Sequence, residues 1–293
     1  MPATASAPAR ASWRFEAIGT AWEIESSDPL GPDARSAIQS CIDEFDAEWS
    51  RFRADSVVSR LARDAGAVTA PADAADMLDA YAALDDATSG AVNPLVGAAL
   101  ASRGYDAAYS FVDGGALVAP ADWRDRLTWA EGTLALDEPA TIDVGALGKG
   151  RLVDRVTGIV ASFIDGDIVV DASGDLAVRG TGVRVGLEHP YDTRRAIGVW
   201  EVTDAALCAS AVNRRAWGDG LHHVLDARTG APVRAVAATW AVAPTAMHAD
   251  AIATALFFDG GEALAAEWGA EWVRMTTDGR VEWSHGSKAE LFV

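Results

Sequence analysis

The sequence predicts an α+β fold in which mixed, mainly antiparallel sheets pack against helices. Half of the 293 residues are hydrophobic and 23% are charged, a composition typical of a chain that buries a large core. Short strand patterns and amphipathic helix patterns alternate irregularly along the chain. The absence of a strict β-α-β order favours antiparallel strands covered by helices over a doubly wound parallel sheet.

We expect residues 1–12 to form a flexible tail, because they are rich in Ala, Pro and Ser. Residues 13–293 are expected to form a single domain, with two closely packed subdomains as the alternative. A chain of this length is long enough for either arrangement. The sequence contains no internal repeat and no long linker.

The first half of the chain contains one clear strand pattern and two helix patterns. Residues 20–24 alternate between apolar and polar side chains, as in a half-buried strand. Residues 31–33, Gly-Pro-Asp, precede a helical spacing of apolar side chains that runs to Trp49. A second helix is expected over residues 71–90, where a terminal glycine ends it.

The second half begins with the clearest amphipathic helix of the chain. It follows Lys149, and Asp165-Gly166 ends it. A buried strand is expected over residues 168–170, with a tight turn at 173–175. Further strands are expected over residues 183–187, 197–202 and 236–242, helices over 247–258 and 262–268, and a final hairpin joining 272–275 to 281–283.

Charge and cysteine usage restrict the partners that we expect. The formal net charge is −19, which disfavours nucleic acid and anionic membranes as partners. Cys41 and Cys208 both fall in apolar patterns, so we predict buried thiols rather than a disulfide. Residues 1–12 lack the apolar segment of a signal peptide, and no apolar run is long enough to span a membrane. We therefore expect a cytoplasmic protein without a membrane anchor.

The segment from Asp143 to Gly150 suggests a phosphate site. Three glycines in six residues let a ligand approach the backbone, and the first N–H groups of the next helix carry partial positive charge. Lys149 adds a full charge. The spacing is not that of a P-loop. An ordinary junction with a solvated lysine is the alternative.

Asp250 and Thr254 suggest a metal site. They are four residues apart, so they lie on one face of an otherwise apolar helix. Carboxylate and hydroxyl oxygens suit a hard divalent cation. The alternative is a helix cap for Asp250 and a hydrogen bond from Thr254 to its own helix. Together with the glycine turn, the pair predicts a site for a metal-bound pyrophosphate.

His223 is a candidate base. It precedes an Asp-x-x-Thr-Gly turn, and a histidine can accept a proton near neutral pH. A turn with two surface histidines, His222 and His223, is the alternative.

These segments, in this order, resemble the ApbE family of FAD:protein FMN transferases. Segments 143–154, 171–175, 223–230 and 250–256 resemble the family patterns DLGAIAKGYAVD, GGD, HIIDPxTG and DALATAL. Residues 15–20 and 49–61 resemble two earlier family segments. The resemblance covers about residues 15–260 and implies the family's α+β, T-fold-like architecture.

The resemblance implies Mg²⁺-dependent transfer of FMN from FAD to a Thr or Ser hydroxyl of an acceptor flavoprotein, with release of AMP. Mg²⁺ is then held by the Ala146 carbonyl and by the side chains of Asp250 and Thr254. His223 accepts the proton of the attacking hydroxyl, and Lys149 lies near the pyrophosphate. The residues implied in FAD binding are Ala146, Gly148, Lys149, Ser173, Gly174, Asp175 and Ser210.

Two other functions remain open at this stage. The same metal site suits an Mg²⁺-dependent FAD pyrophosphatase that gives FMN and AMP. A non-catalytic FAD-binding protein is also open, because Ser173-Gly174 stands where the family has two glycines and Ser210-Ala211 where it has Ser-Gly. Retention of Asp250, Thr254 and His223 favours an enzyme.

Overall fold

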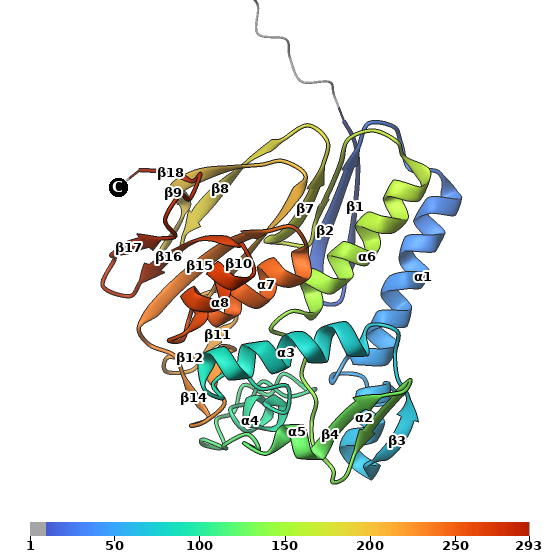
Figure 1. The fold of residues 1–293 in the computed structure, drawn as a ribbon, viewed down its shortest axis with the longest axis vertical. Helices are drawn as coiled ribbons and strands as arrows, with labels where there is room; N and C mark the ends of the chain where they lie inside the picture. The colour runs from blue at the N-terminus through green and yellow to red at the C-terminus, as the bar shows by residue number, and fades with distance from the viewer. Residues whose placement is uncertain (1–9, 293) are drawn as a thin grey trace, which may run out of the picture.

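The structure, a computed structural model, describes residues 10–292 as a mixture of helices and mainly antiparallel strands (Figure 1). The helices are α1 (Pro32–Trp49), α2 (Val57–Asp64), α3 (Ala74–Thr88), α4 (Gly97–Ser102), α5 (Trp123–Arg126), α6 (Gly148–Phe163), α7 (Ala246–Ala255) and α8 (Gly261–Glu267). The strands of the first half are β1 (Ala11–Ala17), β2 (Thr20–Ser26), β3 (Gly66–Thr69), β4 (Leu127–Ala130) and β5 (Thr133–Leu136). The later strands are β6 (Ile168–Asp171), β7 (Asp175–Arg179), β8 (Val183–His189), β9 (Asp192–Val202), β10 (Ala205–Ala211), β11 (Ala216–Trp217), β12 (Leu221–His222), β13 (Leu225–Asp226), β14 (Ala231–Pro232), β15 (Val236–Ala243), β16 (Glu271–Thr276), β17 (Val281–Trp283) and β18 (Glu290–Leu291).

One large sheet organises the molecule. Its eight strands follow the order β1-β2-β6-β7-β10-β15-β16-β17, and every neighbouring pair is antiparallel. Helices α1, α6 and α7 lie beside this sheet (Figure 1), and their apolar residues form the main core with one of its faces. The small sheet of β18, β9 and β8 packs on the other face and forms a second core.

Strand alternation explains how one sheet serves both cores. In β6, Ile168 and Val170 belong to the main core, whereas Val169 between them belongs to the second core. Successive side chains of a strand point to opposite faces, so a strand covered on both sides is apolar throughout. This is why residues 168–170 read as a continuous apolar run.

Helix α6 packs unusually close to α7. A Cβ atom at Gly150 would lie 2.2 Å from the carbonyl oxygen of Ala246 and 2.8 Å from the Cβ of Asp250. No other residue type fits at this position without displacing backbone. Gly150 therefore allows the first turn of α6 to touch the helix that carries Asp250.

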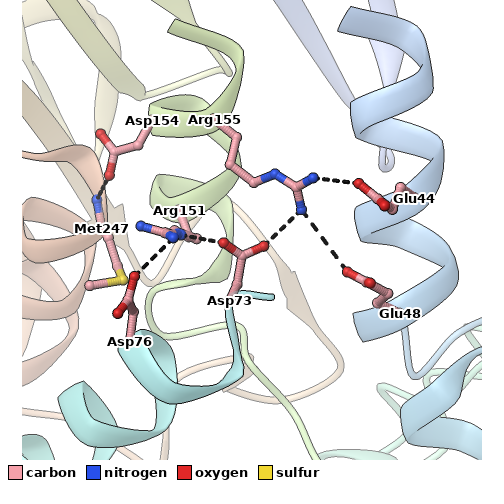
Figure 2. A network of polar contacts seen from close by, with 8 residues as sticks. All are labelled: Glu44, Glu48, Asp73, Asp76, Arg151, Asp154, Arg155 and Met247. Atoms are coloured by element: carbon pink, nitrogen blue, oxygen red, sulfur yellow. Dashed lines mark hydrogen bonds and ion pairs between the residues drawn. The ribbon is translucent and has the colours of Figure 1, made fainter. Parts of the chain in front are cut away.

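A network of ion pairs fixes α6 against two other helices (Figure 2). The buried carboxylate of Asp73, at the start of α3, accepts hydrogen bonds from Arg151 Nε at 2.6 Å and from Arg155 Nη1 at 2.7 Å. Arg155 also pairs with Glu44 of α1, and Arg151 with Asp76 of α3. The network therefore pairs the charges of α6 with those of α1 and of the start of α3.

The same helix also caps α7. Both carboxylate oxygens of Asp154 accept backbone N–H groups at the start of α7, from Ala246 at 2.7 Å and from Met247 at 2.9 Å. Thr245 is the N-cap residue, and its side chain accepts the N–H of His248. The unsatisfied donors of a helix N-terminus are thus bound by a carboxylate from a neighbouring helix.

The predicted α+β class is confirmed, and most of the predicted elements are present. The predicted helices over 33–49 and 71–90 correspond to α1 and α3, the helix after Lys149 to α6, and the last hairpin to β16 and β17. Both cysteines are free and buried, as predicted. The prediction of one domain, or of two closely packed subdomains, stays a prediction.

Several boundaries differ from the prediction, and three of them concern β1, α7 and β7. Strand β1 begins at Ala11, so residues 11 and 12 of the predicted tail are paired with β2, while residues 1–9 lie outside the described residues. Helix α7 ends at Ala255 rather than at residue 258. Asp175 begins strand β7 instead of completing a turn. The bounds of β1 and β7 follow from pairing with other strands, which the local sequence does not show.

Within residues 10–292, no helix combines the length and the apolar character that crossing a lipid bilayer requires.

We predict that Gly150→Ala lowers the free energy of unfolding by about 3 kcal/mol, because its Cβ overlaps backbone of α7. Gly158→Ala is the matched control in the same helix. A Cβ at Gly158 meets no atom within 4 Å, so alanine should raise the stability by about 0.5–1 kcal/mol. Denaturant unfolding of both variants measures the difference. Equal effects would contradict the close contact between α6 and α7.

Candidate active site

A cleft of about 940 Å³ lies where the start of α6 meets a cluster of aromatic side chains that includes Phe52, Tyr105 and Tyr109. Its walls include the turn over residues 143–149, the turn over residues 213–216 and the segment 223–225. Phe52, Tyr105 and other aromatic residues form the remaining wall. The volume lies in the range of pockets that enclose an organic ligand, roughly 300–1,000 Å³.

The turn before α6 is held in place from several sides. The Asp143 carboxylate accepts hydrogen bonds from Arg51 Nε and from the N–H of Gly145, the latter at 2.7 Å. The hydroxyl of Tyr81 donates to the Asp143 carbonyl at 2.9 Å and accepts the N–H of Ala146 at 3.3 Å. Tyr81 is buried, so these contacts fix the turn from the inside.

Two of the three predicted metal ligands, Ala146 and Thr254, line the foot of the cleft, and Asp250 is buried behind it. Thr254 Oγ1 donates to the Ala146 carbonyl oxygen at 3.2 Å. Asp250 lies one helical turn before Thr254, and its Oδ2 accepts the N–H of Gly150 at 3.0 Å. Burial raises the pKa of Asp250 well above its ordinary value, and the charge of Asp175 adds to this rise. A nearby cation would offset that cost.

Lys149 lies between the cleft and a buried carboxylate. Its Nζ is 3.0 Å from Asp175 Oδ2 and donates to the carbonyl of Ala172 at 3.1 Å. Burial alone would lower the pKa of Lys149, but the negative charges of Asp175 and Asp250 outweigh it and raise the pKa. Lys149 therefore stays charged beside the cleft.

His223 lies in the cleft wall beside Arg215. Burial lowers its pKa from 6.5 to about 3, and the positive charge of Arg215 adds to this effect. Its Nδ1 is buried without a hydrogen-bond partner among the described residues. The imidazole is therefore neutral at neutral pH and can accept a proton.

Aromatic rings form another wall of the cleft, which Arg51 joins to the glycine turn. Phe52 and Tyr109 stack with their centroids 5.2 Å apart, and Tyr105 stacks on Trp217 at 5.7 Å. Arg51 lies 4.2 Å from the Phe52 ring centroid. Flat faces of this kind suit a planar ligand ring.

The structure brings most of the predicted site residues together. Those that line the cleft are Ala146, Gly148, Lys149, Ser210, His223 and Thr254. The predicted metal ligand Asp250 and the predicted FAD contacts Ser173, Gly174 and Asp175 do not line it. Ser173 is exposed and donates to the carbonyl of Ala21 at 2.8 Å, and Asp175 is buried against Lys149. Asp175 thus reaches the cleft only through Lys149.

The alternatives that assign these residues no functional role do not fit the geometry. Thr245 rather than Asp250 caps α7, and Thr254 bonds to Ala146 instead of to its own helix. Lys149 is ion-paired rather than solvated. His222 is buried, with Nε2 2.9 Å from the carbonyl oxygen of Val233, so it is no surface residue.

Four further residues shape the cleft that the sequence patterns did not single out. Arg51 and Tyr81 hold the glycine turn, while Tyr105 and Arg215 line another part of the cleft. Arg215 follows another arginine in a strongly acidic chain, and this doublet is the signal that could have indicated it. The roles of Arg51, Tyr81 and Tyr105 depend on contacts over more than fifty residues, which local patterns do not show.

Comparison with known proteins identifies the family. The model of the ApbE family matches residues 18–274, most of the chain, and the chain belongs to this family. A protein of Rhodobacter capsulatus named FAD:protein FMN transferase is 26% identical over 95% of this chain and 57% of its own length. A protein of the same name from Treponema pallidum (strain Nichols) is 30% identical over 43% of this chain and 40% of its own length. The chain thus spans about half of these two relatives.

Solved structures share the fold. The ApbE protein of Thermotoga maritima superposes with a TM-score of 0.80 at 24% identity, covering 94% of this chain and 97% of that one. The flavin transferase ApbE from Vibrio cholerae superposes with a TM-score of 0.78 at 22% identity and the same coverage. The α+β architecture is therefore that of ApbE proteins.

We predict that Tyr81→Phe lowers the free energy of unfolding by about 1–2 kcal/mol, because the Ala146 N–H and the Asp143 carbonyl lose a buried partner. Tyr191→Phe is the matched control, since Tyr191 is 58% exposed. Thermal unfolding of both variants makes the comparison. A Tyr81→Phe protein as stable as the control would show that the hydroxyl does not hold the turn.

Proposed function

We propose that this protein transfers FMN from FAD to a Thr or Ser hydroxyl of an acceptor flavoprotein and releases AMP. One observation carries the proposal. Ala146 and Thr254 line the cleft that also contains Lys149 and His223, and Asp250 is buried one helical turn before Thr254, in a chain of the ApbE family. The names of the relatives from Rhodobacter capsulatus and Treponema pallidum agree with this activity.

The residues at the foot of the cleft fit Mg²⁺. The 3.2 Å between Thr254 Oγ1 and the Ala146 oxygen is close to the separation of about 2.9 Å between neighbouring oxygens of an octahedral Mg²⁺ shell. Asp250 Oδ1 accepts no hydrogen bond from the described residues, so it is free to bind an ion. No group of three or more His, Cys, Asp or Glu side chains in residues 10–292 could hold a metal alone. Substrate phosphates are thus needed to complete such a shell, as is usual for Mg²⁺.

The chain's own groups have separate roles in the reaction. The acceptor oxygen forms a bond to the phosphorus of the FMN half, and the P–O bond to AMP breaks. The electron pair of that bond leaves with AMP, and His223 takes the proton of the attacking hydroxyl. Lys149 places a positive charge beside the pyrophosphate. Bound Mg²⁺ would supply further stabilisation of negative charge on the phosphate oxygens.

The proposal predicts an FMN-sized mass gain on an acceptor peptide when the protein is incubated with FAD and Mg²⁺, measured by mass spectrometry. Asp250→Asn should reduce the rate by at least about 100-fold, and EDTA should abolish the reaction. The matched control is Asp259→Asn, an exposed carboxylate just beyond α7, which should retain the wild-type rate. Free FMN and AMP without labelled acceptor would favour an FAD pyrophosphatase, and intact bound FAD would indicate a binding protein.

The pKa of His223 predicts an unusual pH dependence. A base must be deprotonated to act, and a folded-state pKa of about 3 keeps His223 neutral well below its ordinary 6.5. We therefore expect kcat/KM to show no loss centred near pH 6.5 as the pH falls from 8 to 5. A steady-state pH profile measures this. A tenfold loss per pH unit below 6.5 that disappears in His223→Gln would show that His223 titrates normally.

A further inference from the structure

Arg215 differs from the other arginines of the cleft in having no carboxylate partner. Arg51 pairs with Asp143, and Arg53 pairs with two carboxylates. Within residues 10–292, no carboxylate oxygen lies within 4 Å of the Arg215 guanidinium. With the described residues, the Arg215 side chain makes one hydrogen bond, from Nη1 to the hydroxyl of Tyr105 at 2.9 Å.

The Tyr105 hydroxyl holds this guanidinium at the cleft. Tyr105 is buried, packs against Phe52 and Trp217, and accepts a hydrogen bond from Arg51 at its carbonyl oxygen. Its ring lies 5.9 Å from the Arg215 guanidinium carbon. A guanidinium has five N–H donors in a rigid fork, and Tyr105 takes one of them. The others remain for a ligand that accepts hydrogen bonds.

The charge of Arg215 acts on both the candidate base and the candidate metal ligand. The charge of Arg215 lowers the pKa of His223, after the larger effect of burial, and it opposes part of the rise at Asp250. Both the candidate base and the candidate metal ligand therefore lie within its field. In a chain of net charge −19, an anionic ligand depends on such local cations.

We propose that Arg215 is an anion-binding residue of this cleft, whose guanidinium binds the FAD pyrophosphate and the AMP phosphate that leaves. A guanidinium group can donate two parallel hydrogen bonds to two oxygens of one phosphate, which orients the phosphate as well as neutralising its charge. As the P–O bond breaks, its electron pair adds negative charge to the AMP phosphate, and Arg215 stabilises that charge. The inference rests on the proposed FMN transfer and adds a residue to it.

The test compares two ligands that share parts of FAD. ADP carries the adenine and a pyrophosphate, and riboflavin carries the flavin without phosphate. In Mg²⁺ buffer, Arg215→Gln should weaken ADP binding at least about tenfold, as expected for the loss of charge-assisted hydrogen bonds, and leave the Kd of riboflavin within about twofold. Calorimetry gives the ADP affinity, and flavin fluorescence gives the riboflavin affinity.

Two further variants separate binding from a structural role. The matched control is Arg194→Gln, because this exposed arginine does not line the cleft, is paired with Asp192 at 3.1 Å and should leave both affinities unchanged. Arg215→Lys keeps the charge without the fork and should restore part of the ADP affinity. An unchanged ADP affinity in Arg215→Gln would overturn the inference. So would an equal loss of ADP and riboflavin affinity, which would mean that Arg215 only shapes the cleft.

The same design separates this inference from the proposed reaction. A wild-type protein that binds ADP through Arg215 but never labels an acceptor would disprove the transferase and leave the anion-binding residue. A transferase whose kcat and KM for FAD are both unchanged in Arg215→Gln would disprove the residue and leave the reaction. An increase in KM together with a decrease in kcat is the result that supports both.

Discussion

The contact between the first turn of α6 and helix α7 is the constraint on which the site depends. The N–H of Gly150 donates to Asp250 Oδ2 there, and the absence of a side chain lets the two backbones approach. Helix α6 carries Lys149, and α7 carries Asp250 and Thr254. The contact therefore fixes the position of the group suited to a pyrophosphate relative to the groups suited to a metal. Asp154 of α6 strengthens this contact by capping α7.

The buried charges behind the cleft are not balanced. Asp250 and Asp175 are both buried, and among the described residues Lys149 is the one cation ion-paired there, with Asp175. Burying two carboxylates with one ammonium group leaves negative charge uncompensated. The site is thus prepared for positive charge at its foot, while Arg215 offers positive charge at its wall. This separation of negative and positive charge orients a ligand that contains both a metal ion and phosphates.

The fold and the foot of the cleft could be predicted from the sequence because their determinants are local. The period of α6, the glycine turn before it and the four-residue spacing of Asp250 and Thr254 are all visible within short segments. The aromatic wall and Arg215 could not be predicted, since Tyr105 and Arg215 meet over 110 positions. The turn residues Ser173 and Gly174 match a family motif but do not line the cleft, so their role in FAD binding stays a prediction.

The Tyr81 hydroxyl makes one side of the cleft more rigid than the other. It donates to Asp143 and accepts from Ala146, so neither group can move without losing a hydrogen bond, and the glycine turn is held rigidly. The aromatic wall is held differently: Tyr109 and Phe111 are each 47% exposed, in a segment without regular secondary structure whose backbone bonds to Asp106 and Gly104. Adaptation to ligands of different shape consequently falls to the aromatic side, while the phosphate side keeps its geometry.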